Sequence, residues 1–157
     1  MQRRILSFER DEAGDWVARL DCCHRQHVRH RPPFRSAPWV LDDAARAARV
    51  GTLLECPLCD RAELPQDLVV VRTTELWDEQ TLPAGLRRVH RLADGVWGRL
   101  RVESGALRFS AATEPRIDTV LGARMSQPIP PGVDHEVALV GPVSLAIDFL
   151  RPLPESG

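Results

Sequence analysis

Three cysteines and one histidine in the first part of the chain have the spacing of a metal site. One residue separates Cys22 from His24, and Cys56 and Cys59 form a C-x-x-C pair further along. Three thiolate sulfurs and one imidazole nitrogen can complete the tetrahedral shell of a structural Zn²⁺. A segment of about 60 residues has too small a core to be stable without such support. We therefore predict that Cys22, His24, Cys56 and Cys59 bind zinc.

The choice of the four ligands is open at the level of the sequence. Cys23 could take the place of Cys22, and His27 or His30 could take the place of His24. Two other interpretations compete with the zinc site. The C-x-x-C pair could be a redox site, or the cysteines could be reduced thiols beside exposed histidines that bind nothing.

Two more histidines, His90 and His135, lie far apart in the second part of the chain. Each stands at the predicted end of a strand, and His135 follows a rigid Pro-Pro-Gly corner within Ile129–His135. Imidazoles at strand ends suit a metal or a small ligand at the mouth of a β-barrel. We therefore predict a second, divalent metal site for Zn, Fe, Mn or Ni. The alternative is a pair of hydrogen-bonded histidines without a metal.

Three further residues belong to this predicted second site. Asp148 is the candidate third ligand, but it alternates along Val143–Phe149 with the bulky apolar side chains and so faces away from them. If the bulky face fills the barrel, Asp148 would pair with Arg99 instead of binding the metal. Arg99 and Trp97 are placed in the pocket wall.

Short elements must position the N-terminal ligands. Ile5–Phe8 and Trp16–Leu20 are apolar-rich runs joined by turn residues, which predicts a β-hairpin. Leu41–Val50 is rich in alanine and has Asp42 or Asp43 as an N-cap, which predicts a short helix. Together these elements indicate a small zinc-ribbon-like domain.

A basic run lies between the predicted hairpin and helix. It contains Arg25, Arg29, Arg31 and Arg35, with Phe34 and Trp39 beside it. Zinc, basic and aromatic residues together could bind nucleic acid. The same arginines could equally be a solvated face, with Phe34 and Trp39 as anchors in the small core. We favour the second interpretation and do not expect a nucleic-acid partner.

A polar joint, Ala62–Asp67, is the predicted boundary between a domain at 1–62 and a domain at 63–157. Beyond the joint, short apolar strands alternate with Gly, Pro and Asp turns, a spacing typical of an antiparallel β-sandwich or barrel. We predict strands at Leu68–Thr73, Val96–Glu103, Ala106–Ser110, Ile117–Leu121, His135–Leu139 and Val143–Phe149. The fold class is therefore mainly β.

The N-terminal segment resembles a small bacterial Cys/His domain family that has no assigned activity. The shared pattern is Trp-Val, then C-G-H-x-Q-H-x-R-H-x-P-P, then P-W-V and a closing C-x-x-C, and it covers nearly all of residues 3–61. Cys23 stands where the family has glycine. The resemblance therefore implies that Cys22 and His24 are the family's ligand positions.

The second segment resembles the cupins. Residues 130–135 have the P-x-G-x-x-H pattern of the second cupin motif, whereas the usual H-x-H and glutamate of the first motif are absent and only His90 remains. That departure is similar to the tellurite-resistance TehB N-terminal and YeaR-like family, over residues 76–151. The matching positions are Leu82-Pro83, His90, Gly95-Val96-Trp97, Arg99-Leu100, Gly105-Ala106-Leu107, Ile129, Pro131, His135 and Asp148-Phe149. The resemblance implies a cupin-type barrel and a role in stress or oxyanion resistance.

Composition narrows the function classes further. The formal net charge is −1, so no overall attraction to nucleic acid or to a membrane is expected. No apolar run could span a bilayer and the N-terminus has no signal-peptide core, so we predict a cytoplasmic protein. A homodimer is compatible with the sequence.

The predicted function is a metal-binding cupin that takes a small polar or anionic ligand. The alternative is an interaction module, in which the zinc domain docks the cupin on a protein or nucleic acid. No nucleophile–base pair is evident, so the sequence does not decide between an enzyme and a binding protein.

Overall fold

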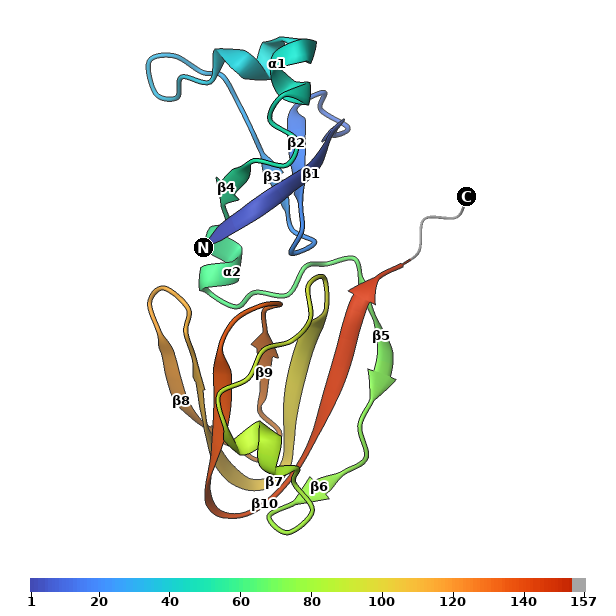
Figure 1. The fold of residues 1–157 in the computed structure, drawn as a ribbon, viewed down its shortest axis with the longest axis vertical. Helices are drawn as coiled ribbons and strands as arrows, with labels where there is room; N and C mark the ends of the chain where they lie inside the picture. The colour runs from blue at the N-terminus through green and yellow to red at the C-terminus, as the bar shows by residue number, and fades with distance from the viewer. Residues whose placement is uncertain (154–157) are drawn as a thin grey trace. The chain divides into compact units, whose positions relative to one another are not determined.

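The computed structural model describes residues 1–153 and divides into two compact units. The N-terminal unit is Met1–Pro57, and the β-domain starts at Leu58. Both consist mainly of antiparallel strands, which confirms the predicted fold class (Figure 1). Within residues 1–153, no helix has the length and apolar character that a membrane span requires.

A four-stranded sheet in the order β3-β2-β1-β4 forms the N-terminal unit. Its strands are β1 (Gln2–Arg10), β2 (Trp16–Leu20), β3 (Arg25–His27) and β4 (Leu53–Glu55). The predicted hairpin is β1–β2, closed by a turn in which the Asp11 carbonyl and carboxylate accept hydrogen bonds from the N–H groups of Gly14 and Asp15. Gly14 has φ +80°, a conformation that glycine adopts without a steric penalty.

The predicted helix is present but short. A 3-10 turn, η1 (Pro38–Leu41), precedes α1 (Asp43–Ala47), and the Asp42 carboxylate accepts a hydrogen bond of 2.7 Å from the N–H of Ala45. Asp42 is therefore the N-cap. α1 ends at Ala47, before the predicted end at Val50.

The two aromatic residues before α1 differ in burial. Trp39 is partly buried, with its ring edge against Phe8 at a centroid distance of 5.8 Å. Phe34 is 95% exposed, so the prediction that it anchors the loop in the core was wrong. It lies at the tip of a short turn in which Arg31 and Arg35 exchange backbone hydrogen bonds of 2.8 and 2.9 Å, and this closed turn holds the side chain away from the core.

The β-domain is one antiparallel sheet in the order β5-β10-β7-β8, with β6 paired to β10 and β9 paired to β7. The helical segment η2 (Ala84–Arg87) accompanies it, whereas α2 (Pro57–Asp60) begins at the last residue of the N-terminal unit. The strands are β5 (Leu68–Thr73), β6 (Trp77–Asp78), β7 (Trp97–Ala111), β8 (Ile117–Gly122), β9 (Ser126–Ile129) and β10 (His135–Pro152).

Two pairs of predicted strands are in fact two long strands. Val96–Glu103 and Ala106–Ser110 form β7, and His135–Leu139 and Val143–Phe149 form β10. Gly105 has φ +72°, and the β7–β10 register shifts between Leu139 and Val143 at the same place. The turn residues therefore bend paired strands instead of ending them.

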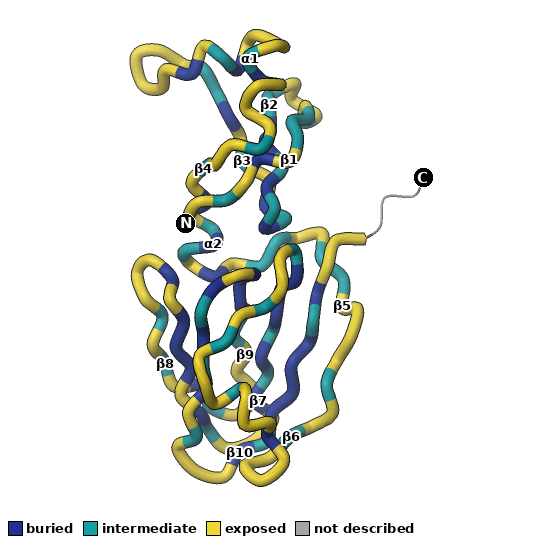
Figure 2. Tube along the Cα trace, viewed as in Figure 1, coloured by how far each residue is buried: buried dark blue, intermediate teal, exposed yellow. Residues whose placement is uncertain are grey.

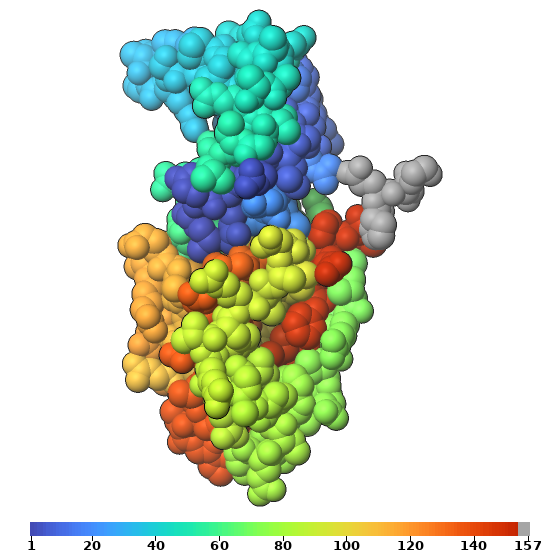
Figure 3. Space-filling model, in the orientation of Figure 1, coloured from blue at the N-terminus to red at the C-terminus, as the bar shows by residue number. Residues whose placement is uncertain are grey.

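The central strands carry the apolar core of the β-domain. The side chains of Trp97, Leu100, Leu107, Phe109 and Leu145 are fully buried. Burial follows β7 and β10, whereas β5 is more exposed (Figure 2). The segment with η2 lies over one face of the domain beside β10 (Figure 3). This arrangement brings His90 to the sheet.

Candidate metal centre and histidine pair

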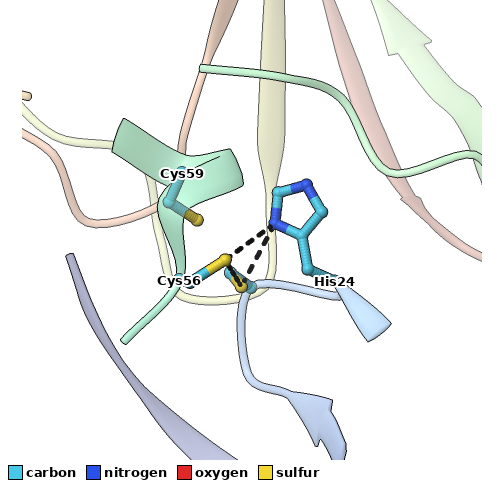
Figure 4. Close-up of side chains that lie close together, drawn as sticks. His24, Cys56 and Cys59 are labelled. Carbon is cyan, nitrogen blue, oxygen red and sulfur yellow. Dashed lines mark hydrogen bonds between the residues drawn. The ribbon is translucent and has the colours of Figure 1, made fainter. Parts of the chain in front are cut away.

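Two separate stretches of chain bring the N-terminal cluster together. Cys22 and His24 lie in the turn between β2 and β3, which two backbone hydrogen bonds close, Cys23 N–H to Leu20 O (2.9 Å) and Leu20 N–H to His24 O (3.0 Å). Cys56 precedes α2 and Cys59 lies in it, so one helical turn presents both sulfurs. Figure 4 shows the side chains of His24, Cys56 and Cys59 close together.

The candidate ligand atoms are close enough to share one ion. His24 Nδ1 lies 3.5 Å from Cys22 Sγ and 3.4 Å from Cys56 Sγ, and the two sulfurs are 3.9 Å apart. With Cys59 included, all the candidate ligand atoms lie within 4.8 Å of one another, and all four residues are buried. The structure joins no two of the described cysteines in a disulfide. This cluster could hold a metal ion.

The three alternative ligands lie outside this cluster. His27 Nε2 is 2.7 Å from the Asp11 carboxylate, and His30 Nδ1 accepts a hydrogen bond of 3.0 Å from the Ala37 N–H. Cys23 is partly exposed and has φ +71°, a conformation that suits glycine. Burial raises the pKa of its thiol. The C-x-H spacing of Cys22 and His24 is thus the one that converges with Cys56 and Cys59.

His90 and His135 lie side by side although they are 45 positions apart in the sequence. Their backbones exchange two hydrogen bonds, His90 N–H to His135 O (3.0 Å) and His135 N–H to His90 O (2.9 Å), and their ring centroids are 4.1 Å apart. The Pro-Pro-Gly corner before His135 and the loop after η2 therefore deliver the two imidazoles to one place.

Backbone carbonyls fix the protonation of both rings. Nδ1 of His90 is 2.8 Å from the Arg88 carbonyl, and Nδ1 of His135 is 2.9 Å from the Val133 carbonyl. Because a carbonyl can only accept, each Nδ1 carries a proton, and in the neutral form of either ring the lone pair lies on Nε2. Burial lowers the pKa of His135, and the proximity of His90 lowers it further. A neutral imidazole is the form that binds a metal.

The cavity beside the two rings is small and otherwise apolar. Its volume is about 10 Å³, which is room for about one water-sized group. It is lined by His90 and His135 together with Leu86, Leu100, Ile129, Val137, Leu145 and Ile147. The only polar side chains that line this space are the two imidazoles.

The structure does not bring Asp148 to the histidines. Its carboxylate accepts hydrogen bonds from Thr73 (2.8 Å), Arg99 (2.8 and 3.0 Å) and Arg101 (3.0 Å), whereas its neighbour Ile147 lines the histidine cavity. Successive residues of a strand face opposite sides, so Asp148 faces away from that cavity. Arg99 therefore belongs to the Asp148 cluster. Trp97 is fully buried in the core and does not line the cavity.

The Asp148 cluster gives a pH-dependent prediction. Burial acts to raise the pKa of Asp148, but the hydrogen bonds from Arg99 and its neighbours outweigh it and hold the pKa below its usual value. Because the folded-state pKa is lowered, its stabilisation is complete above about pH 4 and is lost as the pH falls through the folded-state pKa. We expect Asp148→Asn to reduce the free energy of unfolding by about 2–3 kcal/mol at pH 7, because the arginines lose a buried charge partner.

Urea unfolding of the parent protein and of the Asp148→Asn variant at pH 7 and pH 3 measures the difference in their free energies of unfolding. This difference should be smaller at pH 3. Asp118→Asn is the matched control, because its exposed pair with Arg108 should contribute far less. An Asp148→Asn variant as stable as the parent at pH 7 would contradict the prediction.

The two parts of the chain match two different protein families. Residues 6–63 match a family described as a protein of unknown function (DUF3565), and residues 72–147 match the TehB-like domain family. The second part of the chain is therefore similar to the TehB-like domain family. This confirms the TehB-like part of the resemblance, while the assignments to cupins and to the YeaR-like group stay predictions. No curated protein sequence was found to match.

Solved structures that resemble the chain include the following two. A protein from Escherichia coli strain K12, determined by the Northeast Structural Genomics Consortium, is 29% identical with a TM-score of 0.52, and the match covers 59% of this chain and 98% of that one. TehB from Haemophilus influenzae is 20% identical with a TM-score of 0.50, covering 57% of this chain and 33% of TehB. At that identity, the likeness to TehB concerns the fold alone.

Proposed function

We propose that this protein is a metal-binding protein with two metal sites of different kinds. Zinc in the cysteine–histidine cluster supports the N-terminal unit, and a divalent ion between His90 and His135 belongs to the TehB-like, cupin-type domain. That domain binds a small anionic ligand, in a cytoplasmic stress or tellurite and oxyanion resistance setting. The observation that carries the proposal is that two imidazoles, each oriented by a backbone carbonyl, line one cavity of about 10 Å³.

The distances in the N-terminal cluster support zinc in particular. With Zn–S bonds of about 2.3 Å and Zn–N bonds of about 2.0 Å, a tetrahedral shell separates two sulfurs by about 3.8 Å and a sulfur from a nitrogen by about 3.5 Å. The corresponding separations here are 3.9 Å between sulfurs, and 3.5 and 3.4 Å from sulfur to nitrogen. Donor type and spacing thus both fit a closed structural zinc site.

The histidine pair supports a different kind of site. Two imidazole ligands leave several positions of a divalent ion open, and each ligand has the backbone partner that metal-binding histidines usually have at their other nitrogen. Such an ion would act as a Lewis acid or an anion-binding centre. The chain's own contribution is to orient both rings through the Nδ1 hydrogen bonds and to surround them with apolar side chains.

Metal analysis of the purified full chain tests the proposal. We expect about two equivalents of metal in the parent protein and about one in a His90→Ala/His135→Ala variant. His27→Ala is the matched control, because His27 pairs with Asp11 at the surface, and it should keep both equivalents. The same single equivalent in the parent and in the double variant would overturn the assignment of the histidine pair.

A second candidate function, an interaction module, is favoured by one observation. Phe34 is 95% exposed at the tip of a closed turn, with the exposed side chains of Arg31 and Arg35 on either side. Aromatic and arginine side chains in this arrangement can stack on bases and contact phosphates of a single strand. A gel shift of the full chain with single-stranded DNA tests it, with Phe34→Ala against Leu41→Ala as control. Binding that neither weakens with salt nor depends on Phe34 argues against this function.

A further inference from the structure

A groove of the β-domain lies apart from the histidine cavity. It has a volume of about 380 Å³ and is lined by Val71 and Arg72 of β5, by Val96 just before β7, and by Phe149 and Arg151 of β10. Three lining residues are apolar and the other two are arginines. None of the five lines the histidine cavity.

Strand pairing places both arginines around Phe149. Arg72 is the register partner of Phe149, and its guanidinium carbon lies 5.6 Å from the centre of the phenyl ring. Arg151 follows Phe149 by two residues on β10, so alternation along the strand puts it on the same face. The Arg72 guanidinium thus lies over the ring of Phe149, and Arg151 lies further along β10 on the same face.

The charge of these two arginines is not neutralised in the described part of the chain. Other arginines of this domain have carboxylate partners, as Arg99 and Arg101 have Asp148 and Arg108 has Asp118. Within residues 1–153, neither Arg72 nor Arg151 has a carboxylate oxygen within 4.0 Å. Guanidinium groups beside an apolar wall favour a ligand that combines a negative charge with an apolar body.

The histidine cavity and the groove differ in volume and therefore suit ligands of different size. The histidine cavity, at about 10 Å³, has room for an ion or a water molecule, whereas the groove, at about 380 Å³, has room for an organic molecule. We propose that this groove binds an aromatic organic anion, a carboxylate or sulfonate, which packs against the apolar lining and pairs with Arg72 and Arg151. The inference rests on the proposed function for the anionic ligand class and locates that ligand away from the metal.

Fluorescence titration with the probe anilinonaphthalene sulfonate tests the groove in the full chain. We expect Arg72→Gln/Arg151→Gln to raise the dissociation constant at least tenfold. Arg108→Gln/Arg116→Gln removes the same charge elsewhere in the domain and should leave the constant unchanged. Naphthoate should displace the probe, and the neutral analogue naphthalene methanol should not. Equal binding by the two double variants, equal competition by the neutral analogue, or absence of binding would overturn the proposal.

If the Arg72→Gln/Arg151→Gln variant does not melt cooperatively, the single variant Arg151→Gln is titrated with the probe instead. The His90→Ala/His135→Ala variant separates this inference from the proposed function. It should lose metal and keep its affinity for the probe. If it loses both, the anion binds at the metal and the groove proposal is wrong. If it keeps metal and the Arg72→Gln/Arg151→Gln variant loses the probe, the metal proposal fails and the groove proposal stands.

Discussion

A strong chelator is expected to unfold the N-terminal unit and to leave the β-domain folded. The cluster joins the turn after β2 to α2, and all four of its ligands are buried. Structural zinc binding contributes about 10–16 kcal/mol at neutral pH, as much as the whole stability of a typical domain. The N-terminal unit has few fully buried large side chains, among them Leu20 and Val17, so its apolar core cannot replace that contribution.

Amide hydrogen exchange with and without chelator distinguishes the two units. Protection should disappear along β1 and β2 and persist along β7 and β10. A Cys56→Ser/Cys59→Ser variant should behave like the chelated protein. Cys23→Ser is the matched control, because Cys23 lies outside the cluster. Loss of protection in the β-domain, with the N-terminal unit unaffected, would mean that the structural and the exchangeable metal sites are assigned the wrong way round.

A large loss of stability is also expected from a substitution at Gly105, where β7 and β10 bend together. A Cβ atom at Gly105 would lie 2.0 Å from the Pro142 carbonyl oxygen, which is rigid backbone. Its φ of +72° adds about 1–2 kcal/mol for any residue with a side chain. We therefore expect Gly105→Ala to reduce the free energy of unfolding of the β-domain by about 3 kcal/mol or more.

Denaturant unfolding measures this loss, and Gly141→Ala is a control from the same corner. No atom lies within 4 Å of the Cβ that alanine would add at Gly141, so that variant should be close to the parent. Equal midpoints for the two variants would show that the bend adapts to a side chain, and the steric argument would fail.

The sequence predicted those features that local chemistry decides. The β1–β2 hairpin follows from its turn residues, and the N-cap at Asp42 follows from its short acceptor side chain. The convergence of Cys22, His24, Cys56 and Cys59 agrees with the type and spacing of these residues in the sequence. Register and exposure depend on distant residues. From the sequence, the glycines at 105 and 141 predict strand ends. In the structure, β7 and β10 pair on both sides of them.

Some short elements and surface features were not predicted, because they too depend on contacts between distant residues. β9 contains Pro128 and is a strand only because β7 lies beside it. The exposure of Phe34 depends on a backbone closure between Arg31 and Arg35 that no residue pattern reveals. Arg72 and Phe149 come together only through the register of β5 on β10, so the groove had no signal in the sequence.

The register shift on β5 also bears on self-association. β5 ends the strand order of its sheet, and Val70 and Val71 on it are exposed. Exposed apolar edge strands are templates for intermolecular β-pairing, the first step of aggregation. Here β10 pairs with Val70 and then with Arg72, so the bulge at Val71 interrupts the hydrogen-bonding edge after a few residues. The irregularity that places Arg72 beside Phe149 therefore also makes this edge a poor template for another chain.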